Sequence, residues 1–161
     1  MEIRPYQASD HAGCMVLFES NLPDYFDASE GKMFDSWLSA QDEGHPARDN
    51  SAQDHYYVME KAGALVACAG FYLHTDRQRC SFAWGMVRND LLKQGLGTEM
   101  ARFRIKAIET LYPEAAIRLE TAQYTYRFYE RMGFEVESFT PKYYGPNFDR
   151  YEMRRPGKKG L

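Results

Sequence analysis

The hydrophobic pattern at the start of the chain predicts a short strand followed by two helices. Residues 2–6 alternate between polar and apolar side chains, as an edge strand does. From 9 to 21, apolar residues recur at helical spacing behind an N-cap at Ser9-Asp10. The same spacing returns from 29 to 39, whereas 41–54 is polar and has no apolar period. We therefore expect 41–54 to be an exposed loop.

The next segments predict three strands joined by short turns. Aromatic, β-branched and small apolar residues fill 56–60, 64–73 and 79–88, with turn residues between them. Consecutive strands of this kind form an antiparallel meander. Gly85 lies inside the third strand, where a glycine marks a bulge or a close approach by a ligand.

After the meander, the spacing predicts an amphipathic helix that begins near residue 96. Charged residues occupy its other faces, and its apolar stripe consists of Leu96, Met100, Phe103, Ala107 and Leu111.

The remaining chain predicts one more helix and three more strands. A strand is expected at 116–120, and a helix at 124–132 is closed by Gly133. The last two strands are expected at 134–139 and 148–153, separated by a turn-rich segment.

Composition limits the classes of protein to which this pattern can belong. The chain has 161 residues, of which 44% are hydrophobic, enough for one packed core. Its longest run without a charged or strongly polar residue, 62–73, falls short of the roughly 20 residues that cross a bilayer as a helix. The N-terminus lacks the pattern of a secretory signal. We expect a cytoplasmic protein that does not associate with membranes.

Charge and cysteine content exclude further classes. Twenty basic and 23 acidic residues give a net charge of −3, which offers no electrostatic footprint for nucleic acid. The body is more acidic than this total, because four basic residues lie in the last eight positions. The three cysteines have no pairing or metal-ligand spacing, so we expect reduced core thiols and no bound metal: Cys14, Cys68 and Cys80.

A glycine pair at the start of the third helix carries the first chemical signal. Gly95 and Gly97 allow the backbone to turn tightly, so that the first N–H groups of the helix point outward. Phosphate is the natural ligand of such a helix N-terminus. A Walker loop is excluded because its G-x-x-x-x-G-K-[ST] string is absent. A dinucleotide fingerprint is excluded because Met100 stands where its third glycine is required, and because a meander precedes the loop.

The order of elements from Ile3 to Met153 resembles the GNAT superfamily of acetyl-CoA-dependent N-acetyltransferases. Residues 87–98 look like the family's pyrophosphate loop, with pattern [QR]-x-x-G-x-[GA], and 128–134 look like its F/L-Y-x-x-x-G-F element. Leu92 stands where the family usually has Gln or Arg, so this chain departs from the pattern there.

The resemblance implies a fold and a domain layout. It implies an α+β, GNAT-like single domain at 1–153, with a mixed, mostly antiparallel sheet of six to seven strands flanked by about four helices. A basic C-terminal tail at 154–161 would follow. Exposed strand edges would allow a homodimer.

The resemblance also assigns the donor site, with acetyl-CoA as cosubstrate. The backbone of Met86 and Val87 would pair with the pantetheine arm, and an N–H there would polarise the thioester carbonyl. Gln123 lies near a family position that contacts the pantetheine arm, although an N-terminal capping role fits it equally well. The pyrophosphate would be held by Lys93, Gln94, Gly95, Leu96, Gly97 and Thr98.

Two catalytic roles follow from the resemblance and from amine chemistry. Tyr129 matches the family's tyrosine at the leaving thiolate, where a phenol can donate a proton. A group must also accept the proton of the attacking ammonium, and Glu120 at the end of a strand is the leading candidate. Asp24, His74 and Asp149 stand behind it as alternatives.

The acceptor pocket would be formed by the segment between the first two helices and by the penultimate loop. In the family, these positions border the acceptor site. Its expected residues are Asp24, Tyr25, Phe26 and Tyr144. The leading hypothesis is therefore direct transfer of acetyl to a primary amine of a small molecule or peptide. A non-catalytic acyl-CoA-binding regulatory module and an acetyltransferase of protein N-termini or lysines are the alternatives.

Overall fold

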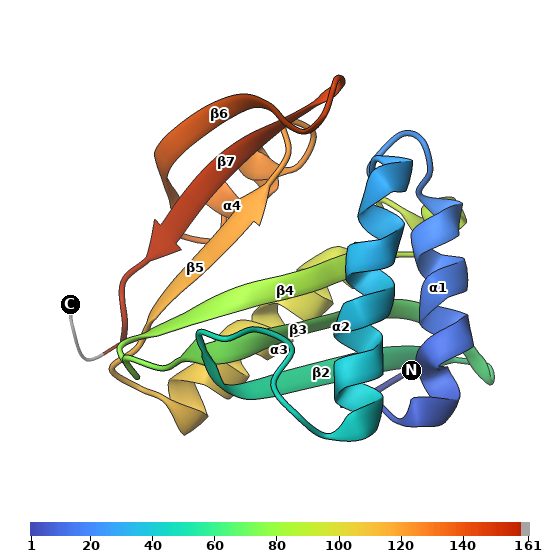
Figure 1. Cartoon of the computed structure of the whole chain (residues 1–161), viewed down its shortest axis with the longest axis horizontal. Helices are drawn as coiled ribbons and strands as arrows, with labels where there is room; N and C mark the ends of the chain where they lie inside the picture. Colours follow the sequence, from blue (N-terminus) through green and yellow to red (C-terminus); the bar gives the residue numbers. More distant parts are fainter. Residues whose placement is uncertain (159–161) are drawn as a thin grey trace.

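A computed structural model describes residues 1–158, within which seven strands form one sheet (Figure 1). The spatial order of the strands is β1-β2-β3-β4-β5-β7-β6. All neighbouring strands are antiparallel except β4 and β5, which run parallel. Their bounds are Glu2–Pro5 (β1), Ser51–Lys61 (β2), Ala64–His74 (β3), Arg79–Val87 (β4), Ala116–Thr121 (β5), Glu135–Gly145 (β6) and Phe148–Arg155 (β7).

Helices cover both faces of the sheet. One face of β2–β4 carries α1 (His11–Ser20) and α2 (Gly31–Glu43), and the opposite face carries α3 (Leu96–Leu111) (Figure 1). The short helix α4 (Tyr126–Glu130) packs against β6 and β7. This confirms the expected α+β fold with a mixed, mostly antiparallel sheet and about four helices.

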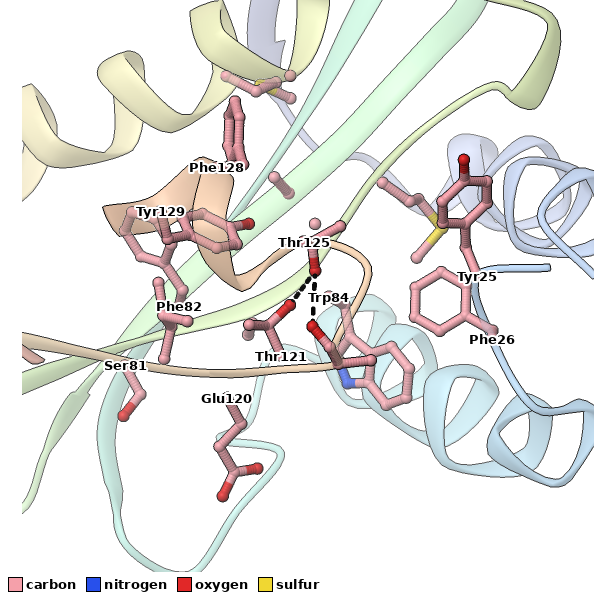
Figure 2. Close-up of a pocket in the computed structure, with 18 of the residues that line it drawn as sticks. Tyr25, Phe26, Ser81, Phe82, Trp84, Glu120, Thr121, Thr125, Phe128 and Tyr129 are labelled. Atoms are coloured by element: carbon pink, nitrogen blue, oxygen red, sulfur yellow. Dashed lines mark hydrogen bonds between the residues drawn. The ribbon is translucent and has the colours of Figure 1, made fainter. Parts of the chain in front are cut away.

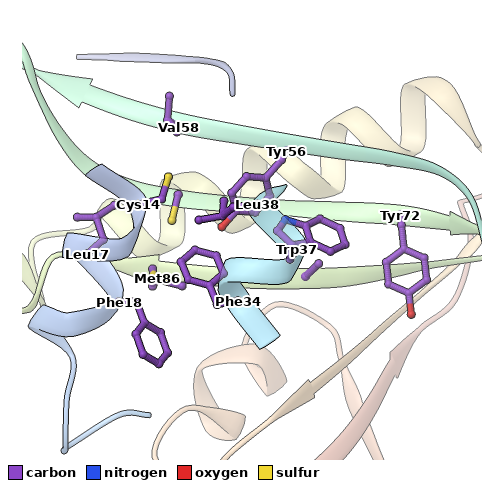
Figure 3. Close-up of a cluster of buried hydrophobic side chains, with 12 residues drawn as sticks. Cys14, Leu17, Phe18, Phe34, Trp37, Leu38, Tyr56, Val58, Tyr72 and Met86 are labelled. Atoms are coloured by element: carbon purple, nitrogen blue, oxygen red, sulfur yellow. The ribbon is translucent and has the colours of Figure 1, made fainter. Parts of the chain in front are cut away.

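An aromatic cluster fixes α1 and α2 to the sheet (Figure 3). Phe18, Phe34 and Trp37 are at most 2% exposed; Phe34 and Trp37 pack against Tyr56 of β2, and Phe18 packs against Phe34. Burying each such side chain contributes about 1.5–3 kcal/mol to folding. Phe26, in the segment between the two helices, packs against Phe18 of α1 and Trp84 of β4, and so holds that segment beside β4.

The buried face of α3 differs from the predicted stripe. The helix begins at Leu96 as expected, but its buried residues are Leu96, Met100, Ala101, Arg104, Ile105 and Ile108. Leu111, which the pattern placed in the core, is 50% exposed. The prediction was wrong here because it excluded a charged residue from the core-facing stripe, and Arg104 lies in the centre of that face.

The strands β4 and β5 pair only at their beginnings. Their parallel register joins Arg79 to Ala116, Cys80 to Ile117 and Ser81 to Arg118, and then ends. Beyond Ser81 the two strands diverge (Figure 1). The β5-facing edge of β4 from 82 to 87 therefore has no strand partner, and a cleft opens in the sheet.

A bulge in β4 lies beside this opening. The register of β3 with β4 shifts between Cys68 and Gly70, and Trp84 has a left-handed φ of 44°. Gly85 follows it, and a Cβ at Gly85 would lie 3.0 Å from a guanidinium nitrogen of Arg104. The glycine thus marks both a bulge and a close approach, although the approaching group is a side chain of the protein itself.

Several predicted boundaries were wrong. The segment 41–54 is not one loop, because α2 continues to Glu43 and β2 begins at Ser51. The turn-rich segment 140–147 belongs largely to β6, which continues to Gly145 with an irregularity after Thr140. Long-range strand pairing overrides the local turn signals in both places.

Other expectations concern single residues and the chain ends. All three cysteines are free and buried, as expected. None of the helices in residues 1–158 is long and apolar enough to span a bilayer. Arg154 and Arg155 belong to β7, and part of the expected tail, 159–161, lies outside the described residues. The domain boundary at 153, the homodimer and the cytoplasmic location stay predictions.

Candidate active site

A cavity of about 1150 Å³ fills the opening between β4 and β5. It extends from the N-terminus of α3 to the segment between α1 and α2 and to the end of β6. Figure 2 shows the side chains of β4, β5 and α4 converging on it, with Tyr25 and Phe26 on its opposite side. One cavity therefore joins the predicted donor and acceptor residues.

The glycine loop at one end of the cavity is shaped for backbone donors. Gly95 precedes α3 with a φ of 86°, and Lys93 has a φ of 63°, so the chain turns through two left-handed positions. Within residues 1–158, the N–H groups of 93–98 donate to no other group. A Cβ placed on Gly95 would meet no atom within 4 Å. The loop presents free amides to open space.

Gly97 lies where this loop meets the cavity. A Cβ at Gly97 would lie 3.8 Å from Val87 and 3.9 Å from Phe128, ordinary contact distances. Lys93, Gly95, Gly97 and Thr98 all line the cavity. The side chains of Leu96 and Gln94 do not line the cavity. Leu96 is buried in the core, and Gln94 is exposed.

The free edge of β4 continues the donor end. Met86 and Val87 line the cavity and pair with β3 on their other side. Asn21, which is 3% exposed, donates its side-chain amide to the Val87 carbonyl at 2.9 Å and to the Leu17 carbonyl at 3.0 Å. This buried amide ties the end of α1 to the end of β4.

Tyr129 lies on α4 with its ring packed among aromatic residues. Its ring centroid is 5.0 Å from that of Phe128, 5.8 Å from Phe134 and 6.2 Å from Phe82. Figure 2 shows its hydroxyl pointing into the cavity. The packed ring and the free hydroxyl give the phenol a defined position.

Arg104 is a buried cation that the sequence pattern missed. It is 3% exposed and lines the cavity, with its guanidinium 3.8 Å from the centroid of Phe82. It donates to the Gly70 carbonyl at 3.3 Å, and its Nε has no partner among the described residues. Burial lowers the pKa of Arg104, and the nearby Tyr129 side chain opposes this shift.

The acceptor end contains three of the four residues expected there. Tyr25, Phe26 and Tyr144 line the cavity, whereas Asp24 is exposed and outside the lining. Tyr25 stacks edge-on against Tyr124 with centroids 6.2 Å apart. This contact brings the segment after α1 against the loop between β5 and α4.

The negative charges of two carboxylates raise the pKa of Tyr144. Burial raises the pKa of Tyr144, and the charges of Glu120 and Glu30 raise it further. Glu120 is exposed and lies 3.4 Å from Arg150. Glu30, which the sequence analysis did not single out, is half-buried, and burial raises its pKa to about 7. A carboxyl group with such a pKa is suited to proton transfer near neutral pH.

The other predicted polar residues serve the hairpin or the sheet. Gln123 donates to the Asn147 carbonyl and accepts from the Asp149 N–H, so both ends of its side chain hold the β6–β7 hairpin. Asp149 accepts from the Lys142 N–H within the same hairpin. His74 lines the cavity and lies 2.7 Å from the Ser81 hydroxyl.

The sequence matches a known family across the region that builds this site. Residues 52–136 of the 161-residue chain match the family model of the acetyltransferase (GNAT) domain. This chain belongs to the GNAT family. No curated protein matches the sequence.

Solved structures of GNAT proteins share its fold. A GNAT-family protein from Desulfovibrio desulfuricans is 17% identical, with a TM-score of 0.79 over 96% of this chain and 98% of that chain. The ribosomal-protein-S18-alanine N-acetyltransferase from Escherichia coli is 18% identical, with a TM-score of 0.73 over 96% and 92%. An aminoglycoside 6′-N-acetyltransferase complexed with coenzyme A is 13% identical, with a TM-score of 0.72 over 97% of both chains.

Family membership makes this GNAT protein an acyltransferase with acetyl-CoA as its acyl donor. The donor end of the cavity fits that molecule. Free amides at a helix N-terminus suit a pyrophosphate, and the unpaired edge of β4 suits the amide-bearing pantetheine arm. Leu92 lines the cavity where the family pattern has a polar side chain, so the backbone supplies the donors there.

Proposed function

We propose that this GNAT protein transfers acetyl from acetyl-CoA directly to a primary amine of a small molecule or peptide. The observation that carries the proposal is the continuous cavity between β4 and β5. It joins free amides at α3, the hydroxyl of Tyr129 and an acceptor end with carboxylates. Reactants that enter from its two ends would meet at the bulge of β4.

On the donor side, the amides of residues 93–98 hold the pyrophosphate and the edge at Met86 and Val87 holds the pantetheine arm. The ammonium of Lys93 and the hydroxyl of Thr98 add contacts to the phosphates. Acetyl-CoA, when bound, supplies the thioester whose acetyl group is transferred. An N–H of the β4 edge polarises its carbonyl.

Tyr129 donates a proton to the departing sulfur. Its hydroxyl faces the cavity, and Arg104 lies beside it with a positive charge in a buried setting. A cation in that position stabilises negative charge that develops on the sulfur and on the phenol oxygen. Arg104 therefore acts as a positioning and electrostatic residue for Tyr129.

Glu30 accepts the proton of the acceptor ammonium, and Glu120 is the competing candidate predicted from the sequence. The charges of both carboxylates act on Tyr144 at the acceptor end, and burial raises the pKa of Glu30 to about 7. A base with that pKa is about half ionised at neutral pH, and its ionised form binds a proton well. The neutral amine then attacks the acetyl carbon, the C–S bond breaks as Tyr129 protonates the sulfur, and the new amide nitrogen returns its extra proton to Tyr129. No covalent enzyme intermediate is required.

Thiol release from acetyl-CoA in the presence of amine panels tests the function. One panel contains small primary amines, and the other contains short peptides with free N-termini or lysines. Amine-dependent release with mass-spectrometric detection of the N-acetyl product is expected. Binding of acetyl-CoA without release on any amine would instead indicate a regulatory module, and release on peptides alone would indicate a protein acetyltransferase.

A further inference from the structure

The cavity has a second polar end, where β3 ends, β4 begins and β5 joins the sheet. Arg48 of the α2–β2 loop, His74 of β3, Arg79 and Ser81 of β4, and Arg118 of β5 all line it there. Ser81 and Arg118 are register partners in the parallel pair, so they lie on one face of the sheet. We call this group of five residues the arginine end.

The loop that carries Arg48 is held against the end of β3. The Thr75 N–H donates to the Asn50 carbonyl at 2.9 Å, and the Ala47 N–H donates to Asp54 at 2.8 Å. The guanidinium of Arg48 lies 5.5 Å from the ring centroid of Tyr72. The short loop thus holds an arginine over the sheet at the cavity wall.

Carboxylates neutralise only part of the charge at the arginine end. Arg79 pairs with Asp76 at 2.9 Å, and Arg118 pairs with Glu137 at 3.0 Å. Arg48 forms no ion pair within residues 1–158. The cluster therefore retains positive charge, although the chain as a whole carries −3.

The positive charge at the arginine end also affects the pKa of His74. Burial lowers its pKa, the positive charges of Arg79, Arg118 and Arg48 lower it as well, and Asp76 opposes them. The lowered pKa favours the neutral imidazole, which shares a 2.7 Å hydrogen bond with the Ser81 hydroxyl. A hydroxyl and an imidazole add neutral hydrogen-bonding groups beside the guanidinium groups.

The two polar ends of the acceptor side have opposite character. Glu30 and Glu120 lie near Tyr144, whereas the three arginines gather at the vertex between β4 and β5. Figure 2 shows Ser81 and Glu120 with side chains pointing the same way, away from Tyr129. Carboxylates and guanidinium groups therefore line the same cavity.

We propose that the arginine end binds an anionic group of the acceptor, so that the substrate is a primary amine that also carries a carboxylate or a phosphate. This inference rests on the proposed function, because it needs the amine to lie near Glu30 and Glu120. Guanidinium groups match the paired oxygens of both anions. A negatively charged group on the substrate would neutralise the charge of Arg48.

Steady-state thiol release on matched amines tests the inference. The probes are ω-amino carboxylates with two to five methylene groups, their carboxamides, the unsubstituted alkylamines, aminoalkyl phosphates and short peptides. We expect kcat/KM about tenfold or more higher for the anionic amines than for their neutral counterparts, mainly through KM. The carboxylate and phosphate series distinguish the two anions.

Two variants of Arg48 and one control variant locate the effect. Arg48→Ala is expected to lower kcat/KM for the anionic amines to about that of their neutral counterparts, while Arg48→Lys retains part of the preference. Arg77→Ala, at an exposed arginine of the β3–β4 turn outside the cavity lining, is the matched control and should behave as the wild type. Thermal melting of each variant checks that it is folded.

The outcomes separate this inference from the proposed function. Acetylation of amines without a preference for anions, or a preference that Arg48→Ala leaves intact, overturns the inference alone. Acetylation of peptides in preference to all small amines also overturns it. Binding of acetyl-CoA without acetylation of any probe overturns the proposed function, and the inference with it.

Discussion

The donor and acceptor ends of the cavity are built from different parts of the chain. At the donor end, free amides of 93–98 and the edge of β4 provide the contacts, and the side chains are mostly small or uncharged. At the acceptor end the contacts are side chains, many of them charged, from segments far apart in sequence. Backbone donors depend on the fold and not on the side chains, so the donor end tolerates a leucine at position 92. The chemical character of the acceptor end, by contrast, changes with each side chain.

A negative charge placed in the amide loop should have the largest effect on the donor end and tests its role directly. Gly97→Glu is expected to abolish acetyl-CoA binding, because the carboxylate would repel the phosphates. The substitution itself fits, since a Cβ at Gly97 makes only ordinary contacts. Isothermal titration of the coenzyme measures the effect.

Gln94→Glu is the matched control for this loop. It adds the same charge three positions away, at an exposed residue outside the cavity lining, and should weaken binding only slightly. Equal affinities in the two variants would show that the loop does not contact the phosphates.

The second prediction separates binding from chemistry at the meeting point of the two ends. Tyr129→Phe should keep coenzyme affinity and lower kcat on the order of 10²–10⁴-fold, because the proton donor is lost. Tyr126→Phe, on the same helix and stacked on Tyr151 at 4.1 Å, is the control. A kcat within twofold of the wild type would remove Tyr129 from the mechanism.

The third prediction concerns the buried cation. Arg104→Met should lower kcat about tenfold, and Arg104→Lys should recover part of it, because the charge beside Tyr129 returns. The thermal midpoint of Arg104→Met should not fall, since a buried charge without a carboxylate partner is costly to bury.

Arg102→Met, at an exposed position of the same helix, is the control for Arg104. A loss of stability in Arg104→Met with unchanged kcat would assign this residue to packing alone.

The smallest expected effect is a pH-dependent change in stability at the acceptor end. The folded-state pKa of Glu30 is raised to about 7 by burial, above its value of 4.5 when unfolded. Its contribution to stability is therefore fully present below pH 4.5 and lost as pH rises through about 7. Glu30→Gln should be more stable than wild type by about 1 kcal/mol at pH 8 and equal to it at pH 4.

The pH dependence of kcat/KM adds a catalytic test of the same residue. In the wild type kcat/KM should rise with pH up to about 7 and then level off, and Glu30→Gln should lose this limb. Glu120→Gln should retain it. The reverse result would assign the base to Glu120.

Local patterns carried most of the predicted fold. The start of α3, the residue Gly133 at the end of α4 and the burial of the cysteines follow from spacing and turn chemistry within a few residues. Boundaries failed where distant pairing decided them, as in β6 and at the start of β2. Arg104 was missed because its burial depends on the bulge of β4 and on Gly85, which lie on another element.

The amide loop, the position of Tyr129 on its helix and the aromatic segment after α1 were predictable from the amino-acid sequence, because each is a local motif of a few residues. The separation of β4 and β5 after Ser81, the position of Arg104 beside Tyr129, and the shared cavity of Glu30 and Arg48 became visible only in the folded chain. These arrangements join residues that are far apart in the chain, and their charges and burial depend on packing that no local pattern specifies.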